Sequence, residues 1–306
     1  MKVGVVSNTE WCVPLLQYLR SANVETVLYL GAYNAATDVS SLISFCGSNN
    51  IAVEKENDPV QLFSWLQLQQ PDYCFVYGYK KLIDVKRLEG FQKKLFNIHP
   101  GSLPKYRGAS PIFWQMKNGE ATLGLTIHFI NERYDAGEIV WSREINNEAH
   151  FSFGMVEYIF SNLLIEGVNH ILSHVIDSLF TTGVKQNEND AVTYKKPTLK
   201  DVLINWQTMQ ANEVVNLVRA CNPWNKGAIA VYNGMEVKVI DAELSDVETE
   251  KMPGTITEAG VGIGVVCKGN SVVKINFMNM NGIFVPGRFA RSFGFVPGQS
   301  FITPTQ

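Results

Sequence analysis

The sequence lacks the features that mark several large classes of protein. Its 306 residues carry 26 Lys and Arg against 29 Asp and Glu, for a net charge of −3. Proteins that hold nucleic acid through its phosphates need clustered positive charge, so this balance disfavours an RNA or DNA ligand. No apolar run of about 20 residues, which a membrane-spanning helix requires, occurs in the sequence. We therefore expect a soluble, cytoplasmic protein.

Cysteine is scarce, and glycine-rich phosphate loops are missing. The five cysteines form no Cys-x-x-Cys pair, and their odd number argues against a disulfide framework or a zinc cluster. Neither Gly-x-Gly-x-x-Gly nor a P-loop follows the first strand-like run, so no dinucleotide cofactor is expected. These absences predict a reducing compartment and no bound metal.

The first half of the chain alternates strand-like apolar runs with amphipathic segments. Strands are predicted at 2–7, 25–30, 51–54, 72–78, 95–99 and 122–130, with helices at 12–21, 39–48, 60–69 and 111–118. Such alternation is typical of βαβ units. We expect an α/β fold with a doubly wound, mainly parallel sheet, in which ligands bind beyond the carboxyl ends of the strands.

The second half has a different pattern. A helix predicted at 152–179 is followed by a polar segment with several Gly, Asn and Pro residues, and then by one helix at 211–220. Short strand-like runs separated by glycines come last, and they indicate a small barrel or sandwich. The predicted organisation is a first domain over 1–182, a linker over 183–200 and a barrel domain over 201–306.

Three polar residues in the first half suggest a catalytic group. Asn97 and His99 are two apart on a predicted strand, so both side chains project from one face. Asp135 lies in a turn-like run after a later strand. Taken singly, each is most simply structural: a strand-end cap, a hydrogen-bonded histidine and a turn residue. Their joint occurrence beside a Pro/Gly-rich loop is what indicates catalysis.

An amide, an imidazole and a carboxylate suit the transfer of an acyl group to an amine. That reaction passes through a tetrahedral intermediate, whose negatively charged oxygen needs hydrogen-bond donors. We interpret the Asn97 amide and a protonated His99 as those donors. A carboxylate at Asp135 would raise the pKa of His99, orient it and assist proton removal. The remaining histidines are interpreted as structural: His128, His150, His170 and His174.

The order Asn97-x-His99, then Leu103-Pro104 with Arg107-Gly108, then Asp135-x-Gly137 resembles the motif of the folate-dependent formyltransferases. The resemblance implies that Asn97, His99 and Asp135 form a catalytic triad and that 10-formyltetrahydrofolate is the donor, with no metal. It also implies a folate site in which backbone and turn residues hold the pterin ring. The residues of that site would be Lys81, Leu82, Ile83, Leu103, Pro104, Asn131, Glu132, Arg133 and Tyr134.

Later runs extend the resemblance to the family's OB-like carboxyl-terminal domain. They include Ile204-Asn205-Trp206, residues 219–224 and residues 253–255. The first domain would then be the catalytic one. In the second, Trp206, Pro223 and Trp224 are interpreted as packing residues.

Two enzyme types share this layout: one formylates methionyl-tRNA, and the other formylates amino sugars carried on nucleotides. The tRNA enzymes carry a basic loop after the second strand, whereas residues 31–38 here contain no Lys or Arg. The run Gly101-Ser102-Leu103-Pro104 resembles the small-amine enzymes more closely. Residues 200–306 hold 9 Lys and Arg against 9 Asp and Glu, although a barrel that serves a nucleic acid should be basic. All three departures favour a small amine, such as a nucleotide-linked amino sugar, as the acceptor.

Two alternatives stay open. The chain could be a methionyl-tRNA formyltransferase with a divergent loop, or an inactive relative that only binds folate. Retention of Asn97, His99 and Asp135 argues against an inactive relative. The oligomeric state is also open, and a neutral second domain is compatible with a homodimer surface.

Overall fold

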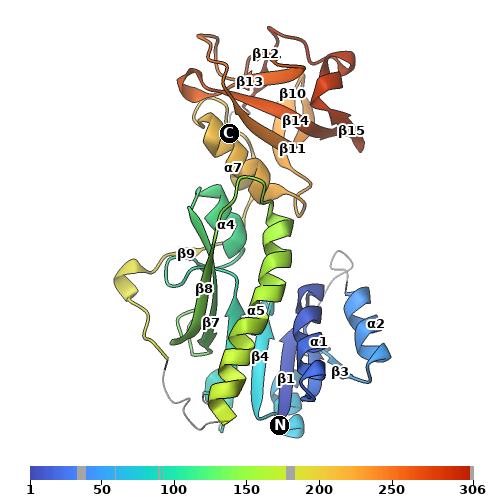
Figure 1. Cartoon of the computed structure of the whole chain (residues 1–306), viewed down its shortest axis with the longest axis vertical. Coiled ribbons are helices and arrows are strands. Elements are labelled where there is room, and N and C mark those ends of the chain that lie inside the picture. Colours follow the sequence, from blue (N-terminus) through green and yellow to red (C-terminus); the bar gives the residue numbers. More distant parts are fainter. Residues whose placement is uncertain (33–38, 59, 89, 92, 177–182, 304–306) are drawn as a thin grey trace. The chain divides into compact units, whose positions relative to one another are not determined.

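A computed structural model describes residues 1–303, apart from 33–38, 59, 89, 92 and 177–182 (Figure 1). Packing divides the chain into two compact units. Unit 1 consists of Met1–Pro111, Leu123–Ile145 and Glu157–Tyr194, and unit 2 of Ile112–Thr122, Asn146–Val156 and Lys195–Gln306. The segment expected as a linker is therefore shared, with 183–194 in unit 1 and 195–200 in unit 2. The domain boundaries at 182 and 201 stay a prediction.

Unit 1 is built on a sheet with the strand order β3-β2-β1-β4-β5-β7-β8 (Figure 1). The strands are β1 (Lys2–Ser7), β2 (Glu25–Leu30), β3 (Ala52–Lys55), β4 (Tyr73–Tyr77), β5 (Leu95–His99), β7 (Thr122–Phe129) and β8 (Ile139–Asn146). Strands β3, β2, β1, β4 and β5 pair in parallel, whereas β7 is antiparallel to β5. The predicted doubly wound, mainly parallel α/β fold is confirmed.

Helices separate these strands along the chain. They are α1 (Val13–Ser21), α2 (Ser40–Ser48), α3 (Gln61–Gln69), α4 (Pro111–Lys117) and α5 (Phe153–Ile176). Helix α3 buries Leu62, Trp65 and Leu66 against Val76 and other apolar side chains of the sheet. Of the helix predicted at 152–179, the last three residues lie outside the described part of the chain. None of the helices that the structure describes is long and apolar enough to cross a membrane.

A small parallel pair joins two distant segments of unit 1. Strand β6 (Arg107–Gly108) follows the loop after β5, and it pairs with β9 (Thr193–Tyr194). A Cβ atom on Gly108, which has a φ of 93°, would lie 2.2 Å from the Tyr194 carbonyl oxygen. Only glycine therefore fits at position 108, where the two segments approach each other closely.

Unit 2 contains an antiparallel sheet with the order β12-β13-β14-β11-β10-β16, and β15 pairs with β14. Its strands are β10 (Ala228–Tyr232), β11 (Met235–Ser245), β12 (Ile256–Ala259), β13 (Gly262–Val266), β14 (Val272–Met280), β15 (Ile283–Pro286) and β16 (Phe301–Ile302). A bridge between Thr255 and Ser300 joins the two edges of the sheet. The sheet therefore closes, as predicted for a small barrel.

Two helices precede the barrel strands: α6 (Leu199–Val202) and α7 (Ala211–Cys221). Trp206 is fully buried and its ring centroid lies 5.5 Å from that of Phe301 on the last strand. Trp224 is 42% exposed, and its ring meets Phe113 edge-on. Burial thus agrees with a packing role for Trp206 more fully than for Trp224.

Candidate active site

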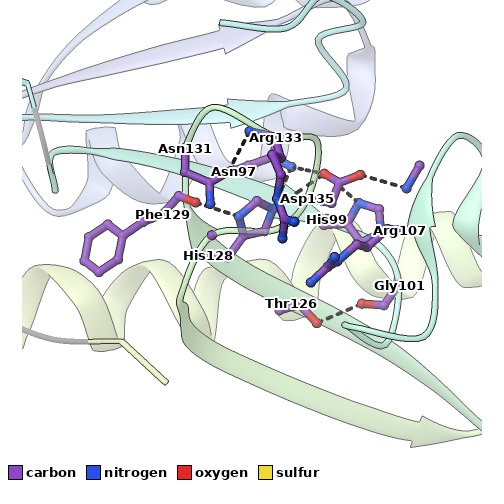
Figure 2. A network of polar contacts seen from close by, with 12 residues as sticks. Asn97, His99, Gly101, Arg107, Thr126, His128, Phe129, Asn131, Arg133 and Asp135 are labelled. Atoms are coloured by element: carbon purple, nitrogen blue, oxygen red, sulfur yellow. Dashed lines mark hydrogen bonds and ion pairs between the residues drawn. The ribbon is translucent and has the colours of Figure 1, made fainter. Parts of the chain in front are cut away.

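Asn97 and His128 face one another on neighbouring strands. Strands β5 and β7 pair antiparallel, with Asn97 opposite His128 and His99 opposite Thr126. Cross-strand partners, and residues two apart, project from the same face of a sheet. Asp135 follows β7 in a turn, where its φ of 52° is in the left-handed region. Figure 2 shows Asn97, His99 and His128 gathered around the Asp135 carboxylate.

The Asn97 amide has a partner for each of its two N–H groups. Its Nδ2 atom donates to Asp135 Oδ1 over 3.1 Å and lies 3.1 Å from Nε2 of His128. His128 is buried, and its Nδ1 atom lies 2.8 Å from the Phe129 carbonyl oxygen. A carbonyl oxygen only accepts, so Nδ1 carries the proton and Nε2 accepts from Asn97. The neutral ring of His128 therefore fits these contacts.

His99 is buried and makes a different set of contacts. Its Nε2 atom lies 2.6 Å from the Tyr106 carbonyl oxygen, and its Nδ1 atom lies 3.4 Å from Asp135 Oδ1. Burial lowers the pKa of His99, although Asp135 and the Tyr106 carbonyl oppose that shift. In the neutral ring, Nε2 donates to Tyr106. A proton gained at Nδ1 would face the Asp135 carboxylate, so the His99–Asp135 pair can accept one proton.

The Asp135 carboxylate is the centre of this group. Besides its contact with Asn97, its Oδ2 atom accepts from the backbone N–H of Gly108 over 2.8 Å. Burial alone would raise the pKa of Asp135, but the nearby His99 ring and the Gly108 bond outweigh that effect. They hold the pKa of Asp135 well below its usual range. The carboxylate is therefore ionised at neutral pH.

The turn that carries Asp135 is held by a segment distant in the sequence. Gln186 Nε2 donates to the carbonyl oxygens of Asp135 and Gly137 over 2.8 and 2.7 Å. Arg107 in turn donates Nε and Nη2 to Gln186 Oε1 over 3.0 and 2.8 Å. Arg107 also pairs with Glu188 at 2.9 Å. Arg107 and Gln186 therefore hold the turn in place, although the left-handed backbone at Asp135 is strained.

A hollow opens beside these side chains. It is lined by Val76, Tyr79, Lys81, Leu82, Ile83, Asn97, His128, Ile130, Asn131, Arg133, Tyr134 and Asp135. Six of the residues predicted to hold folate are among them: Lys81, Leu82, Ile83, Asn131, Arg133 and Tyr134. Leu103, Pro104 and Glu132 do not line this hollow, and Glu132 pairs with Lys86 at 3.3 Å instead. Of the predicted triad, Asn97 and Asp135 line it, whereas His99 does not.

A buried carboxylate fixes the loop on one side of the hollow. The Glu56 side chain is 1% exposed and lies 3.1 Å from Lys81 Nζ. It accepts from Tyr79 Oη and from the Ala32 backbone N–H, each over 2.7 Å. Burial would raise the pKa of Glu56, but these bonds lower it below its usual value. The Tyr79–Lys81 loop is thereby tied to the strand ends of β2 and β3.

Sequence reasoning missed three residues that the structure brings to this group. His128 was interpreted as structural, and no role was expected for Arg107 or Gln186. The antiparallel register of the predicted strands at 95–99 and 122–130 would have placed His128 opposite Asn97. Arg107 and Gln186 carry no such signal, because the burial of Arg107, which requires acceptors such as Gln186, is seen only in the structure.

Metal-ligand chemistry has no counterpart within the described residues. No group of three or more His, Cys, Asp or Glu residues there could hold a metal ion. The polar atoms of the site are instead bonded to one another. The arrangement offers an amide donor, an ionised carboxylate and two imidazoles, which together suit acyl transfer with proton removal.

Comparison with protein families identifies the chain. A model described as formyl transferase matches residues 22–156, and one described as formyl transferase, C-terminal domain, matches residues 197–282. The chain belongs to the formyl transferase family. It is a folate-dependent formyl group transferase, as the resemblance predicted.

Curated relatives align over nearly the whole chain. The methionyl-tRNA formyltransferase of Clostridium tetani is 28% identical over 299 residues, which are 93% of this chain and 94% of the relative. The methionyl-tRNA formyltransferase of Thermotoga neapolitana is 29% identical and covers 92% of this chain and 91% of the relative. These relatives are matched in both halves of the chain.

Solved structures share the fold at lower identity. WlaRD, a sugar 3N-formyl transferase, is 17% identical with a TM-score of 0.72, over 90% of this chain and 97% of its own. The N-formyltransferase from Helicobacter canadensis is 18% identical with the same TM-score of 0.72, over 90% and 98%. HypX from Aquifex aeolicus is 19% identical with a TM-score of 0.67, over 96% of this chain. This chain spans about half the length of HypX, 48%.

Proposed function

We propose that this chain transfers a formyl group from 10-formyltetrahydrofolate to a small amine, such as an amino sugar attached to a nucleotide. The observation that supports the proposal most is the hollow in which an amide and an ionised carboxylate lie side by side. Asn97 and Asp135 supply those groups, and both are partly or fully shielded from solvent. Shielding strengthens hydrogen bonds to a developing charge.

The residues around the hollow fit a flat heterocycle such as the pterin ring. Val76, Ile83 and Ile130 supply apolar surface, while Asn131 and the Asp135 turn supply polar groups. An apolar pocket with a few fixed polar groups is typical of small-molecule sites. The folate, when bound there, would supply the activated formyl group, and the hollow would hold that group close to the Asn97 amide.

The chain's own residues would then handle charge and protons. As the amine nitrogen bonds to the formyl carbon, negative charge develops on the formyl oxygen. An Asn97 N–H stabilises that charge as a shared hydrogen bond, because both N–H groups also have acceptors within the site. The amine loses a proton in the same process. The His99–Asp135 pair takes up that proton at Nδ1 of His99, where Asp135 Oδ1 lies 3.4 Å away and Tyr106 holds the opposite nitrogen. The bond between the formyl carbon and N10 of the folate then breaks, and the proton passes from His99 to N10, so that the formylated amine and tetrahydrofolate leave. The earlier expectation that His99 itself donates to the oxygen stays a prediction.

Charge on the barrel supports a small acceptor. Arg291 pairs with Glu258 at 2.6 Å, and Lys274 pairs with Glu243 at 2.7 Å. Phosphate binding needs cations that are not already neutralised. Of the loop 31–38, which lacks basic residues, 33–38 lie outside the described residues, so its sequence alone supports the proposal there. WlaRD, which has the same fold, is named a sugar 3N-formyl transferase, and the Helicobacter canadensis N-formyltransferase is in complex with folinic acid and dTDP-3-aminofucose.

The proposal is tested by offering 10-formyltetrahydrofolate with a panel of amines. The panel contains methionyl-tRNA and several nucleotide-linked amino sugars, and mass spectrometry detects formylated product. We expect product from at least one amino sugar. Formylation of methionyl-tRNA alone would overturn the small-amine assignment, and no product from any amine would overturn formyl transfer to these classes.

Methionyl-tRNA is the second candidate acceptor, because relatives 28% and 29% identical are named methionyl-tRNA formyltransferases. An enzyme for that acceptor must bind initiator tRNA at low salt, and the affinity must fall steeply as salt rises. A gel-shift titration at two salt concentrations measures both. Absence of binding at low salt removes this candidate.

A further inference from the structure

We propose that His128 is a positioning residue that keeps the Asn97 amide turned so that its two N–H groups point at Asp135 and at His128 itself, beside the hollow. It does so only as a neutral ring with the proton on Nδ1. This inference rests on the proposed function for its meaning in catalysis. It deepens that function by assigning a fourth residue to the site.

The tautomer of His128 follows from its two contacts. Nδ1 lies 2.8 Å from the Phe129 carbonyl oxygen, which can only accept a hydrogen bond. The proton of the neutral ring is therefore on Nδ1, and Nε2 carries a lone pair. That lone pair lies 3.1 Å from Asn97 Nδ2 and accepts from it.

The orientation of the Asn97 amide depends on this lone pair. An asparagine side chain can turn over and exchange its oxygen and nitrogen, so its partners decide which end points where. Here Asp135 Oδ1 and His128 Nε2 are both acceptors, and each lies 3.1 Å from Nδ2. A proton on Nε2 would replace an acceptor by a donor. The amide oxygen would then be drawn towards His128, and Asn97 would lose its donor orientation.

Burial makes the arrangement specific. The His128 side chain is 2% exposed, so water cannot replace Asn97 as its partner at low cost. The charged groups that face it are Asp135, with Oδ1 3.6 Å from Nε2, and His99, whose ring centroid lies 6.4 Å away. The hollow adds four titratable side chains from its other walls: Tyr79, Lys81, Arg133 and Tyr134.

Loss of the lone pair should reduce turnover more than folate binding. A correctly turned Asn97 amide can share an N–H with the formyl oxygen as charge develops there, and an interaction made mainly in the transition state affects kcat. The hollow's apolar lining, which includes Val76 and Ile83, is untouched by such a change. A defect in kcat with a nearly unchanged KM for folate would therefore mark a positioning role.

The first test needs no acceptor amine. Long-range ¹H–¹⁵N NMR correlations distinguish the Nδ1–H and Nε2–H tautomers of each histidine in the full chain at neutral pH. We expect His128 as the Nδ1–H tautomer and His99 as the Nε2–H tautomer, with the spectrum of His128→Gln assigning the signals. A His128 ring that is protonated on Nε2 overturns the inference.

The second test compares two variants of His128. In His128→Gln the amide oxygen can accept from Asn97, so we expect kcat within about fivefold of the wild type. In His128→Leu no acceptor remains, and we expect kcat to fall about 10- to 100-fold with the KM for folate changed less than about threefold. The matched control is His150→Gln, because His150 is exposed and outside the site.

Rescue by the glutamine variant separates positioning from a merely structural effect. A structural role of the ring predicts equal losses of kcat in the Gln and Leu variants, whereas positioning of Asn97 predicts a loss in His128→Leu that His128→Gln does not share. Equal losses in the Gln and Leu variants overturn the inference. If the wild type formylates no amine, the proposed function fails, while the NMR tautomer still decides the inference by itself.

Discussion

The group around Asp135 and the surface of the barrel use charge in opposite ways. At the first, the side chains of Asp135, His99 and His128 are 11%, 5% and 2% exposed, and fixed partners surround them. On the barrel, Arg291 and Glu258 form an ion pair in which both side chains are more than half exposed. Exposed pairs contribute little to stability, whereas a buried group that loses its partner costs much more.

This difference separates the chemistry of the donor from the choice of the acceptor. Donor chemistry depends on a few buried atoms whose positions tolerate little change. Acceptor choice depends on surfaces where charge can vary without harm to the fold. Substitutions in the buried group should therefore change the rate strongly, and substitutions on the barrel should leave it nearly unchanged.

The largest effect is expected at the half-buried Asn97 amide. Asn97→Ala removes the N–H that we assign to the formyl oxygen, so kcat should fall by about 10²- to 10³-fold. Steady-state kinetics measures the loss, and thermal unfolding checks that the fold is intact. The control is Asn162→Ala on α5, whose amide bonds only local groups of its own helix. Similar rates for the two variants would remove the contrast between buried and exposed polar groups.

A buried carboxylate in unit 1 should show the contrast in stability. Burial raises the pKa of Glu157 from 4.5 to about 7, and a hydrogen bond with Trp11 opposes the shift. A carboxyl group with a raised pKa stabilises the fold fully at pH values below the pKa that it has in the unfolded chain. That stabilisation is lost as the pH rises through the folded-state pKa of about 7. At pH 8, Glu157→Gln should exceed the wild type in free energy of unfolding by about 1–3 kcal/mol, with no such gain at pH 4.

Chemical denaturation at the two pH values measures this effect. The matched control is Glu258→Gln on the barrel, because the Glu258 side chain is 70% exposed. That change should stay within about 0.5 kcal/mol at both values. If Glu157→Gln behaves like the control at pH 8, burial does not raise the pKa of the Glu157 carboxyl group.

A smaller loss is expected when the support of the site is removed. Gln186→Ala deletes both bonds to the Asp135 and Gly137 carbonyl oxygens and leaves Arg107 with Glu188 as its acceptor. We expect kcat to fall about tenfold, because a displaced carboxylate still binds but no longer lies where the proton leaves. The control is Gln67→Ala, because Gln67 is an exposed glutamine on α3, and steady-state kinetics compares the two variants. Equal rates would mean that the turn needs no support from Gln186.

The smallest effect is expected on the barrel. Replacing the exposed Arg288 and Arg291 together by Glu should change formylation of an amino sugar by less than about twofold. If methionyl-tRNA is the acceptor, the same double variant should weaken binding and flatten its salt dependence. Measuring both acceptors with this double variant thus shows whether the surface of the barrel contributes to acceptor binding.

Much of the fold could be predicted from the sequence because its central strands are buried on both faces. Strands β1, β2 and β5 begin and end where their apolar runs predicted. Strand β8 was missed, since its residues are half-buried or exposed and show no clear alternation. The short strands β6 and β9 were missed too, because two residues carry no periodic signal.

The site was only partly predictable for a related reason. Asn97, His99 and Asp135 could be found because they lie in a recognisable order along the chain. His128 joins them through the pairing of β5 with β7, and Gln186 joins through a contact between residues far apart in sequence. Such contacts depend on register and on tertiary packing, which composition and spacing do not encode locally.

The most direct test of the account is a competition between the two acceptor classes. Wild-type enzyme receives 10-formyltetrahydrofolate with methionyl-tRNA and a nucleotide-linked amino sugar at equal concentration, and the initial rate of each formylated product is measured. The account predicts faster formylation of the amino sugar, and loss of that product in Asn97→Ala. Faster formylation of methionyl-tRNA would contradict it.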